Sequence, residues 1–227
     1  MSAVIFDLDG TLADTAADLI AAANACFEAR GWGPLLHPID DATTAFRGGR
    51  KMLKLGFSRV GMDCDDQTME ENYAEFVGFY RANLIQDTKL YPGVASALTD
   101  LRSAGFAIGI CTNKPEAQAE EVVRRLGIQN HIDSLVGADT LPVRKPDPRP
   151  YFEAVDRAGA NGRTSLLVGD TETDVATARA AGVPCVLVNF GPEGRGISRL
   201  NGDAYLDNLS EITELAIDMI GRPETGR

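Results

Sequence analysis

Histidine is nearly absent from this chain of 227 residues, which contains only His37 and His131. The two lie in unrelated sequence contexts, so a histidine-rich metal site is excluded and a Ser-His-Asp triad is disfavoured. The four cysteines are widely separated and form no CxxC pair. This spacing disfavours a zinc site or a disulfide framework and is typical of a reducing compartment.

Positive charge is also scarce, because 22 Lys and Arg residues face 33 Asp and Glu residues and give a formal net charge of −11. Such a surface repels nucleic acid and anionic membranes, although a local basic pocket is compatible with it. No apolar run approaches membrane-spanning length, and no basic segment with a long apolar stretch opens the chain. We therefore expect a cytoplasmic protein that binds neither nucleic acid nor membrane.

Apolar runs alternate with helical patterns over most of the chain. The sequence predicts strands at 4–7, 107–111, 134–136, 165–168 and 185–188, and helices at 92–105, 116–126, 149–158, 173–181 and 210–220. Near-continuous apolar strands separated by helices indicate an α/β fold with a doubly wound parallel sheet, covered by helices on both faces.

The segment after the first strand has a different texture. It contains no strand candidate, and apolar spacing indicates helices at 14–30, 40–46, 50–60 and 65–84. We expect a small helical domain at 15–87, inserted into a catalytic core formed by 1–14 and 88–227. The two connections, near 12–15 and 85–91, are candidate hinges.

Two acidic residues, Asp7 and Asp9, follow the first apolar run. They stand two apart, so in extended backbone both side chains would project to the same side, and Gly10 lets the chain turn beyond them. Like charges this close repel unless a cation lies between them or one carboxyl keeps its proton. Either condition suits catalysis, whereas the plainer interpretation is a strand followed by an ordinary turn.

Further polar side chains stand at other strand ends and in one loop: Thr112, Asn113, Lys145, Asp170 and Asp174. Ligands of open parallel sheets bind beyond the carboxyl ends of the strands, so these side chains are expected to meet the first two aspartates. Each alone has a plain explanation, because threonine and aspartate are common at helix starts and lysine is common in loops. Their shared location at the carboxyl ends of the strands favours a functional site over these separate structural explanations.

The combined inventory matches phosphoryl transfer, in which a protein holds a dianion and neutralises developing charge. Asp7, Asp9 and Asp170 form a hard oxygen site suited to Mg²⁺, and Thr112 and Lys145 suit phosphate oxygens. The chain has no GK[ST] phosphate loop, so binding of nucleoside triphosphates in that manner is not indicated.

These motifs resemble those of the haloacid dehalogenase superfamily of phosphatases. They are DLDGT at 7–11, a threonine after a hydrophobic strand, Lys145 followed by proline, and GDxxxD at 169–174. Their order is specific for the superfamily but much less specific for the substrate. The helical insert looks like the superfamily's first type of cap. TNKP at 112–115 and RKPDP at 144–148 look most like the phosphoglycolate phosphatase branch.

The resemblance implies a covalent aspartyl-phosphate mechanism. Asp7 would attack phosphorus, and Asp9 would protonate the leaving oxygen and then take a proton from water. Mg²⁺ would be held by the Asp7 carboxylate, the Asp9 backbone carbonyl and Asp170, with Asp174 orienting metal-bound waters. Thr112 and Lys145 would bind phosphoryl oxygens.

Substrate selectivity is expected to reside in the insert. A helix start with nearby cations and glycines at 46–51 is favourable for anions. Arg47 and Gly48 are therefore candidates for contact with the substrate, together with Asn113 of the core. Arg50 and Lys51 are expected to be solvated.

The leading interpretation is a Mg²⁺-dependent phosphomonoesterase for a small anionic metabolite, with 2-phosphoglycolate favoured and sugar phosphates, nucleoside monophosphates and pyrophosphate open. Haloacid dehalogenases lack the second aspartate of the first motif, so Asp9 argues against them. Isomerases of the β-phosphoglucomutase kind typically have a histidine where Leu19 stands. A non-catalytic relative is expected to have lost a nucleophile, a metal ligand or the lysine. A monomer and a homodimer both fit the sequence.

Overall fold

The computed structural model describes residues 1–83, 85–160 and 164–223. The chain divides into two compact units. The first, here called the core unit, comprises Met1–Ala13 and Leu90–Arg227, and the second, the helical unit, comprises Asp14–Lys89. Among the described residues, no helix combines the length and the apolar character that crossing a bilayer requires.

The core unit is built on a six-stranded sheet in the order β5-β4-β1-β6-β7-β8, in which the neighbouring strands pair in parallel. Its strands are β1 (Ala3–Phe6), β4 (Ala107–Cys111), β5 (Ser134–Val136), β6 (Ser165–Gly169), β7 (Cys185–Val188) and β8 (Ala204–Leu206). The predicted doubly wound α/β fold is confirmed. The edge strand β8 was missing from the prediction, because its three residues, AYL, form only a very short apolar run between Asp203 and Asp207.

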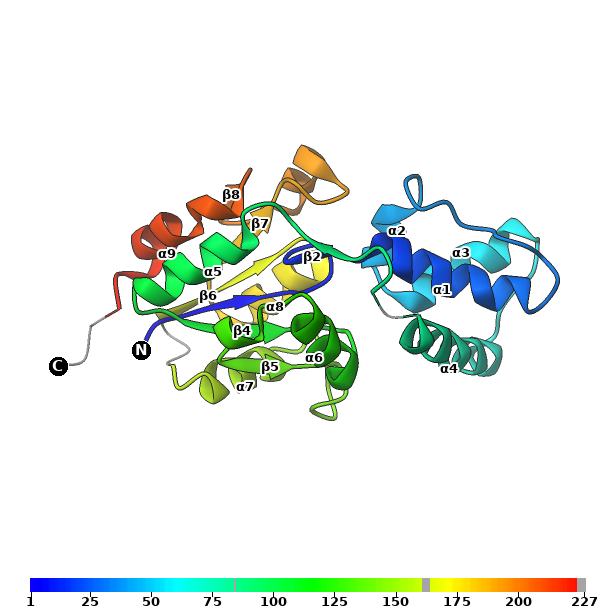
Figure 1. Cartoon of the computed structure of the whole chain (residues 1–227), viewed down its shortest axis with the longest axis horizontal. Coiled ribbons are helices and arrows are strands. Elements are labelled where there is room, and N and C mark those ends of the chain that lie inside the picture. Colours follow the sequence, from blue (N-terminus) through cyan, green and yellow to red (C-terminus); the bar gives the residue numbers. More distant parts are fainter. Residues whose placement is uncertain (84, 161–163, 224–227) are drawn as a thin grey trace. The chain divides into compact units, whose positions relative to one another are not determined.

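Helices cover both faces of this sheet. They are α5 (Val94–Ser103), α6 (Glu116–Arg125), α7 (Arg149–Arg157), α8 (Glu172–Ala181) and α9 (Ile212–Ile220), with short 3-10 turns at Gln129–His131, Gly194–Leu200 and Leu209–Glu211. Helices α5 and α9 lie on one side of the sheet, and α6 and α7 lie on the other (Figure 1). On the second side, Tyr151 of α7 and Val175 of α8 share a buried cluster with Ile5 and Leu167 of the sheet.

The helical unit contains α1 (Ala16–Glu28), α2 (Ala42–Phe46), α3 (Gly49–Arg59) and α4 (Asp66–Ala82). These are the four helices expected from the sequence, although Leu84, predicted as the end of the last one, lies outside the described residues. Part of the interior is aromatic: the Phe57 ring meets the Phe27 ring edge-on at a centroid distance of 6.3 Å. Gly56 of α3 lets α3 approach α1 closely, because a Cβ at this position would collide with the Phe27 ring of α1.

The chain crosses between the units at two points, and two short strands pair with each other there. They are β2 (Ala13–Asp14) and β3 (Lys89–Leu90). Neither was predicted, because two residues carry no periodic pattern. Just before β3, the buried Asp18 carboxylate accepts hydrogen bonds from the backbone N–H groups of residues 86 to 88 and from the Thr88 hydroxyl at 2.6 Å. Asp18 thus anchors the second crossing to α1.

Replacing Asp18 by alanine is expected to lower the free energy of unfolding by about 2 kcal/mol, because several donors lose a charged acceptor. Urea denaturation followed by circular dichroism measures this change. Asp87→Ala is the matched control, since Asp87 is exposed, and it should change stability by less than about 0.5 kcal/mol. Equal stabilities of the two variants would show that Asp18 is not an anchor.

Candidate active site

The sheet register brings the polar segments of the core unit to one edge. Phe6 of β1 pairs with Ile110 of β4 and with Val168 of β6. The three strands therefore end almost level, and the residues that follow them share the carboxyl edge. Strand-like hydrogen bonding continues one residue further, since the Asp7 N–H donates to the Val168 carbonyl at 2.9 Å. This backbone hydrogen bond to β6 fixes the position of Asp7 at the edge of the sheet.

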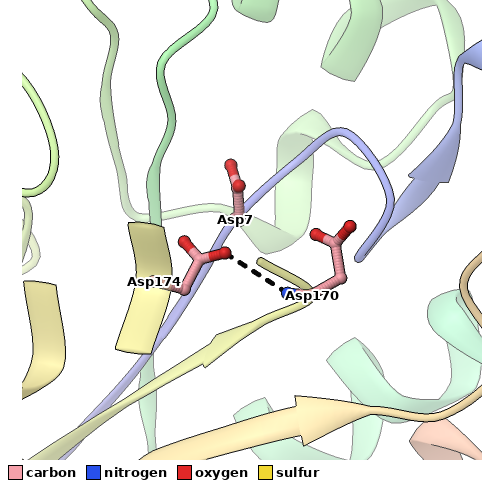
Figure 2. A group of neighbouring side chains, drawn as sticks. All are labelled: Asp7, Asp170 and Asp174. Atoms are coloured by element: carbon pink, nitrogen blue, oxygen red, sulfur yellow. Dashed lines mark hydrogen bonds between the residues drawn. The ribbon is translucent and has the colours of Figure 1, made fainter. Parts of the chain in front are cut away.

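Three carboxylates gather at this edge: Asp7, Asp170 and Asp174 (Figure 2). One oxygen of each lies within 4.8 Å of the others, and all three residues are buried. The Asp170 N–H points at an Asp174 oxygen at 3.3 Å, and the Thr11 hydroxyl donates to Asp170 Oδ1 at 2.9 Å. Two strand ends and one helix start thus supply a set of hard oxygen ligands.

The start of α8 orients Asp174. Thr171, the residue before the helix, forms a capping box with Asp174, whose Oδ2 accepts from the Thr171 N–H at 3.0 Å and from its hydroxyl at 2.6 Å. The plain explanation of this aspartate as a residue of the first helical turn is therefore correct. It is also incomplete, because the other oxygen of the same carboxylate faces the cluster.

Lys145 counters the negative charge of this cluster. Its Nζ donates to Asp174 Oδ1 at 2.6 Å and lies 3.0 Å from Asp7 Oδ2, in a side chain that is almost fully buried. Burial opposes the ammonium charge, but the Asp174 and Asp7 carboxylates outweigh it and raise the pKa of Lys145. The lysine therefore remains a cation at neutral pH.

One ammonium does not compensate three buried carboxylates. Burial raises the pKa of Asp7 to about 6, despite the opposing charge of Lys145. Burial also raises the pKa of Asp170 well above its usual value, and the charges of Asp174 and Asp7 add to the effect. A hard divalent cation among these oxygens would relieve this repulsion, so the donor set fits such a metal.

Two glycines, Gly10 and Gly191, allow the backbone to pass close to the carboxylate cluster. Gly10 has a φ of +84°, and a Cβ there would collide with the Asp170 carboxylate. On the loop after β7, a Cβ at Gly191 would lie only 3.3 Å from the Gly10 carbonyl oxygen. Both positions therefore favour glycine because of close approach. Gly191 was not singled out in the sequence, since a lone glycine after a strand is common.

Asp9 has a different environment from Asp7. Its two carboxylate oxygens accept hydrogen bonds from Lys114 Nζ at 2.8 and 2.7 Å, and the Lys114 side chain is only 2% exposed. From the sequence, Asp9 was grouped with Asp7 and Asp170 as one oxygen site and was expected to contribute its backbone carbonyl, which leaves its carboxylate available for other contacts. In the described structure, Asp174 completes the carboxylate cluster, and Asp9 instead pairs with Lys114.

The segment after β4 places its polar residues around these groups. Thr112 is buried, and its hydroxyl accepts from the Lys114 N–H at 3.2 Å. Asn113 is exposed and donates from its side-chain amide to the Lys145 carbonyl at 3.1 Å. Asn113 therefore ties the Lys145 loop to the end of β4.

The candidates in the helical unit lie in the turn between α2 and α3. Arg47 and Gly48 are exposed, and Gly48 has a φ of +98° that favours glycine. Arg50 was expected to be merely solvated, which is wrong. Its guanidinium lies 3.7 Å from the centre of the Tyr73 ring and makes two hydrogen bonds to the Glu70 carboxylate. It joins α3 to α4.

Two residues of the site, Thr11 and Lys114, were absent from the candidates. Both stand inside motifs that were recognised, DLDGT and TNKP. Their spacing was therefore available as a signal, but a threonine in a turn and a lysine before a helix have common structural explanations. The contacts to Asp170 and Asp9 become visible only when the strands are placed side by side.

The comparisons with known proteins agree with this geometry. The model of the haloacid dehalogenase-like hydrolase family matches residues 4–188. The chain belongs to this family. The resemblance drawn from the four motifs is therefore confirmed, and the matched range includes the carboxylate cluster, Lys145 and the Asp9–Lys114 pair.

Named relatives of this hydrolase include phosphoglycolate phosphatases. That of Mesorhizobium japonicum is 35% identical over 223 residues, which is 96% of either chain. That of Agrobacterium fabrum is 34% identical over 210 residues, covering 92% of this chain and 89% of the relative. A crystal structure of a predicted phosphoglycolate phosphatase from Haemophilus somnus superposes with a TM-score of 0.82 at 23% identity, covering 95% and 97% of the two chains. This structure shows the shared fold.

Lys145→Met is expected to lower the free energy of unfolding by about 3 kcal/mol, because it leaves buried carboxylates without their cation. Urea denaturation at pH 7 measures the loss. Lys51→Met removes an exposed lysine and should be nearly neutral. If both variants were equally stable, the cluster would not depend on the ammonium of Lys145.

Proposed function

We propose that this hydrolase is a phosphatase that removes the phosphoryl group of 2-phosphoglycolate and uses Mg²⁺ as its metal. The observation that carries this proposal is the pairing of Lys145 with Asp7 and Asp174 beside Asp170, at the carboxyl edge of the sheet. A nucleophile, a cation and a hard-ligand set lie together there. The names of the curated relatives, which align over most of the chain, support the substrate.

The metal would be held by the carboxylates of Asp7 and Asp170 and by the backbone carbonyl of Asp9, with Asp174 orienting bound water. Bound Mg²⁺ would supply positive charge to the phosphoryl oxygens. The hardness of the donors and the repulsion among them support this assignment. Asp174 is suited to an indirect role, because Thr171 and Lys145 already occupy its two oxygens.

The reaction proceeds in two displacements at phosphorus. In the first, an Asp7 oxygen forms a bond to phosphorus, the bond to the substrate oxygen breaks, and Asp9, which takes up a proton from solvent before this step, gives that proton to the substrate oxygen. In the second, Asp9 takes a proton from water, the water oxygen attacks phosphorus, and the Asp7 carboxylate is released. Both carboxyl groups thus return to their initial state.

Lys145 and Thr112 bind the phosphoryl oxygens during these steps. The ammonium of Lys145 already touches the Asp7 carboxylate, so it stands next to any group that Asp7 attacks. Thr112 contributes a buried hydroxyl at the end of β4. Asn113 acts indirectly by holding the backbone of Lys145.

The helical unit acts as a cap domain, and its two connections act as hinges. Capping would exclude water from the covalent intermediate until hydrolysis. Arg47 and Gly48 contribute to substrate selectivity, because they are exposed cationic and backbone groups in an otherwise acidic chain. A small phosphorylated metabolite with a second negative charge suits such a surface.

The substrate is tested by phosphate release from purified protein with Mg²⁺. The panel compares 2-phosphoglycolate with sugar phosphates, nucleoside monophosphates, pyrophosphate and p-nitrophenyl phosphate. We expect kcat/KM for 2-phosphoglycolate to exceed the others by at least about 100-fold. A uniform low profile would retain the phosphatase chemistry and reject this substrate.

Asp7→Asn is expected to lower kcat by at least about 10³-fold, because an amide does not form the acyl phosphate. The melting temperature should stay within a few degrees of the native value, since the side chain keeps its size. Asp63→Asn, at an exposed position of the helical unit, is the control for charge removal. Near-native turnover by Asp7→Asn would exclude the covalent mechanism.

Arg47→Ala is expected to raise KM for 2-phosphoglycolate about 10-fold and to leave KM for p-nitrophenyl phosphate nearly unchanged, because the aryl ester lacks a second anion. Steady-state kinetics on both substrates measure the difference. A proportional change for the two esters would reject a selective role for Arg47.

A further inference from the structure

Lys114 is held more firmly than a surface lysine. Its N–H donates to the Thr112 hydroxyl at 3.2 Å, and its carbonyl accepts from the Ala138 N–H at 2.9 Å. The backbone at the end of β4 is thus fixed on both sides of the residue. The side chain is 2% exposed and reaches Asp9 with its ammonium. A lysine only needed for solubility would not be buried in this way.

A buried ammonium needs an anionic partner, since its desolvation is costly when it is uncompensated. Asp9 satisfies this need with both of its oxygens. In the proposed reaction, however, an Asp9 oxygen must turn to the oxygen that leaves phosphorus. Lys114 then loses one of the two Asp9 oxygens as an acceptor. Another anionic acceptor next to the ammonium would restore the balance of charge.

The substrate itself has an acceptor within reach. The leaving oxygen must lie about 2.7 Å from an Asp9 oxygen to receive a proton, and Lys114 Nζ lies 2.8 and 2.7 Å from the two Asp9 oxygens. In 2-phosphoglycolate the carboxylate is attached to the carbon that bears this leaving oxygen. Its oxygens are therefore about 3 Å from the leaving oxygen, so a carboxylate oxygen can reach the ammonium that lies on the other side of the Asp9 carboxylate.

We propose that Lys114 binds the carboxylate of the substrate. Its ammonium donates to this carboxylate one of the hydrogen bonds that it donates to Asp9 in the free enzyme. This inference rests on the proposed function and deepens it. It assigns the site to phosphate monoesters with a carboxylate on the carbon that carries the phosphoryl oxygen. This contribution to selectivity comes from the core unit, from a group beside the proposed acid, and adds to the contribution proposed for Arg47 of the helical unit.

The test compares two substrates on each enzyme variant. Ethyl phosphate has the leaving oxygen and carbon chain of 2-phosphoglycolate but lacks the carboxylate. We expect Lys114→Met to lower the ratio of kcat/KM for 2-phosphoglycolate to that for ethyl phosphate by about 10- to 100-fold. Lys114→Arg should keep part of the ratio. Lys54→Met, which removes an exposed lysine of α3, should keep all of it.

The ratio is insensitive to partial misfolding, because both substrates report on the same folded molecules. If Lys114→Met is too unstable to assay, Lys114→Arg and Lys114→Gln provide the same comparison. An equal loss on both substrates would overturn the proposal and show that Lys114 acts only through Asp9. Measurements on the native enzyme distinguish failure of the proposed substrate from failure of the proposed role of Lys114. Native preference for 2-phosphoglycolate with an unchanged ratio in the variants rejects the role of Lys114 alone, whereas no native preference rejects the substrate and the inference together.

Discussion

The ion pairs of Lys145 with Asp7 and Asp174 are the interaction on which the site depends. Carboxylates at two strand ends and a helix start repel each other when they are buried together, and the ammonium makes their approach tolerable. In the proposed function, the same ammonium would also stabilise the phosphoryl group. One charge would then serve both the stability of the free protein and the binding of the substrate, which would account for a lysine buried at the edge of a sheet.

The backbone supplies the precision that these charges need. Parallel pairing of Phe6 with Ile110 and Val168 makes three strands end level, so side chains from distant parts of the sequence converge without any special loop. Gly10 then lets the chain turn directly against the Asp170 carboxylate, where a Cβ would not fit. Functional groups placed by strand ends are held more rigidly than groups on long loops.

Much of this arrangement could be predicted from the sequence, because strands buried on both faces are continuous apolar runs and their ends are marked by polar residues. The edge strand β8 and the paired strands β2 and β3 could not, since they are short and lack such a pattern. The residues of the carboxylate cluster were predicted, but the partner of Asp9 was not. Lys114 was recognised only as part of the TNKP motif, and Arg50 was expected to be solvated. Only tertiary packing shows that Lys114 is buried against Asp9 and that Arg50 is stacked on Tyr73.

The balance of charge at the sheet edge favours a cation among the acidic side chains. Four acidic side chains (Asp7, Asp9, Asp170, Asp174) outnumber the two ammonium groups (Lys114, Lys145) by two, 4 minus 2, and burial raises the pKa of Asp7 and Asp170 there. A phosphate dianion approaching this site would be repelled. In the proposed function, a divalent cation held by these oxygens would offset the excess of negative charge, and the two lysines would then attract the substrate. The proposed metal would in this way make an acidic site in an acidic protein suited to phosphate.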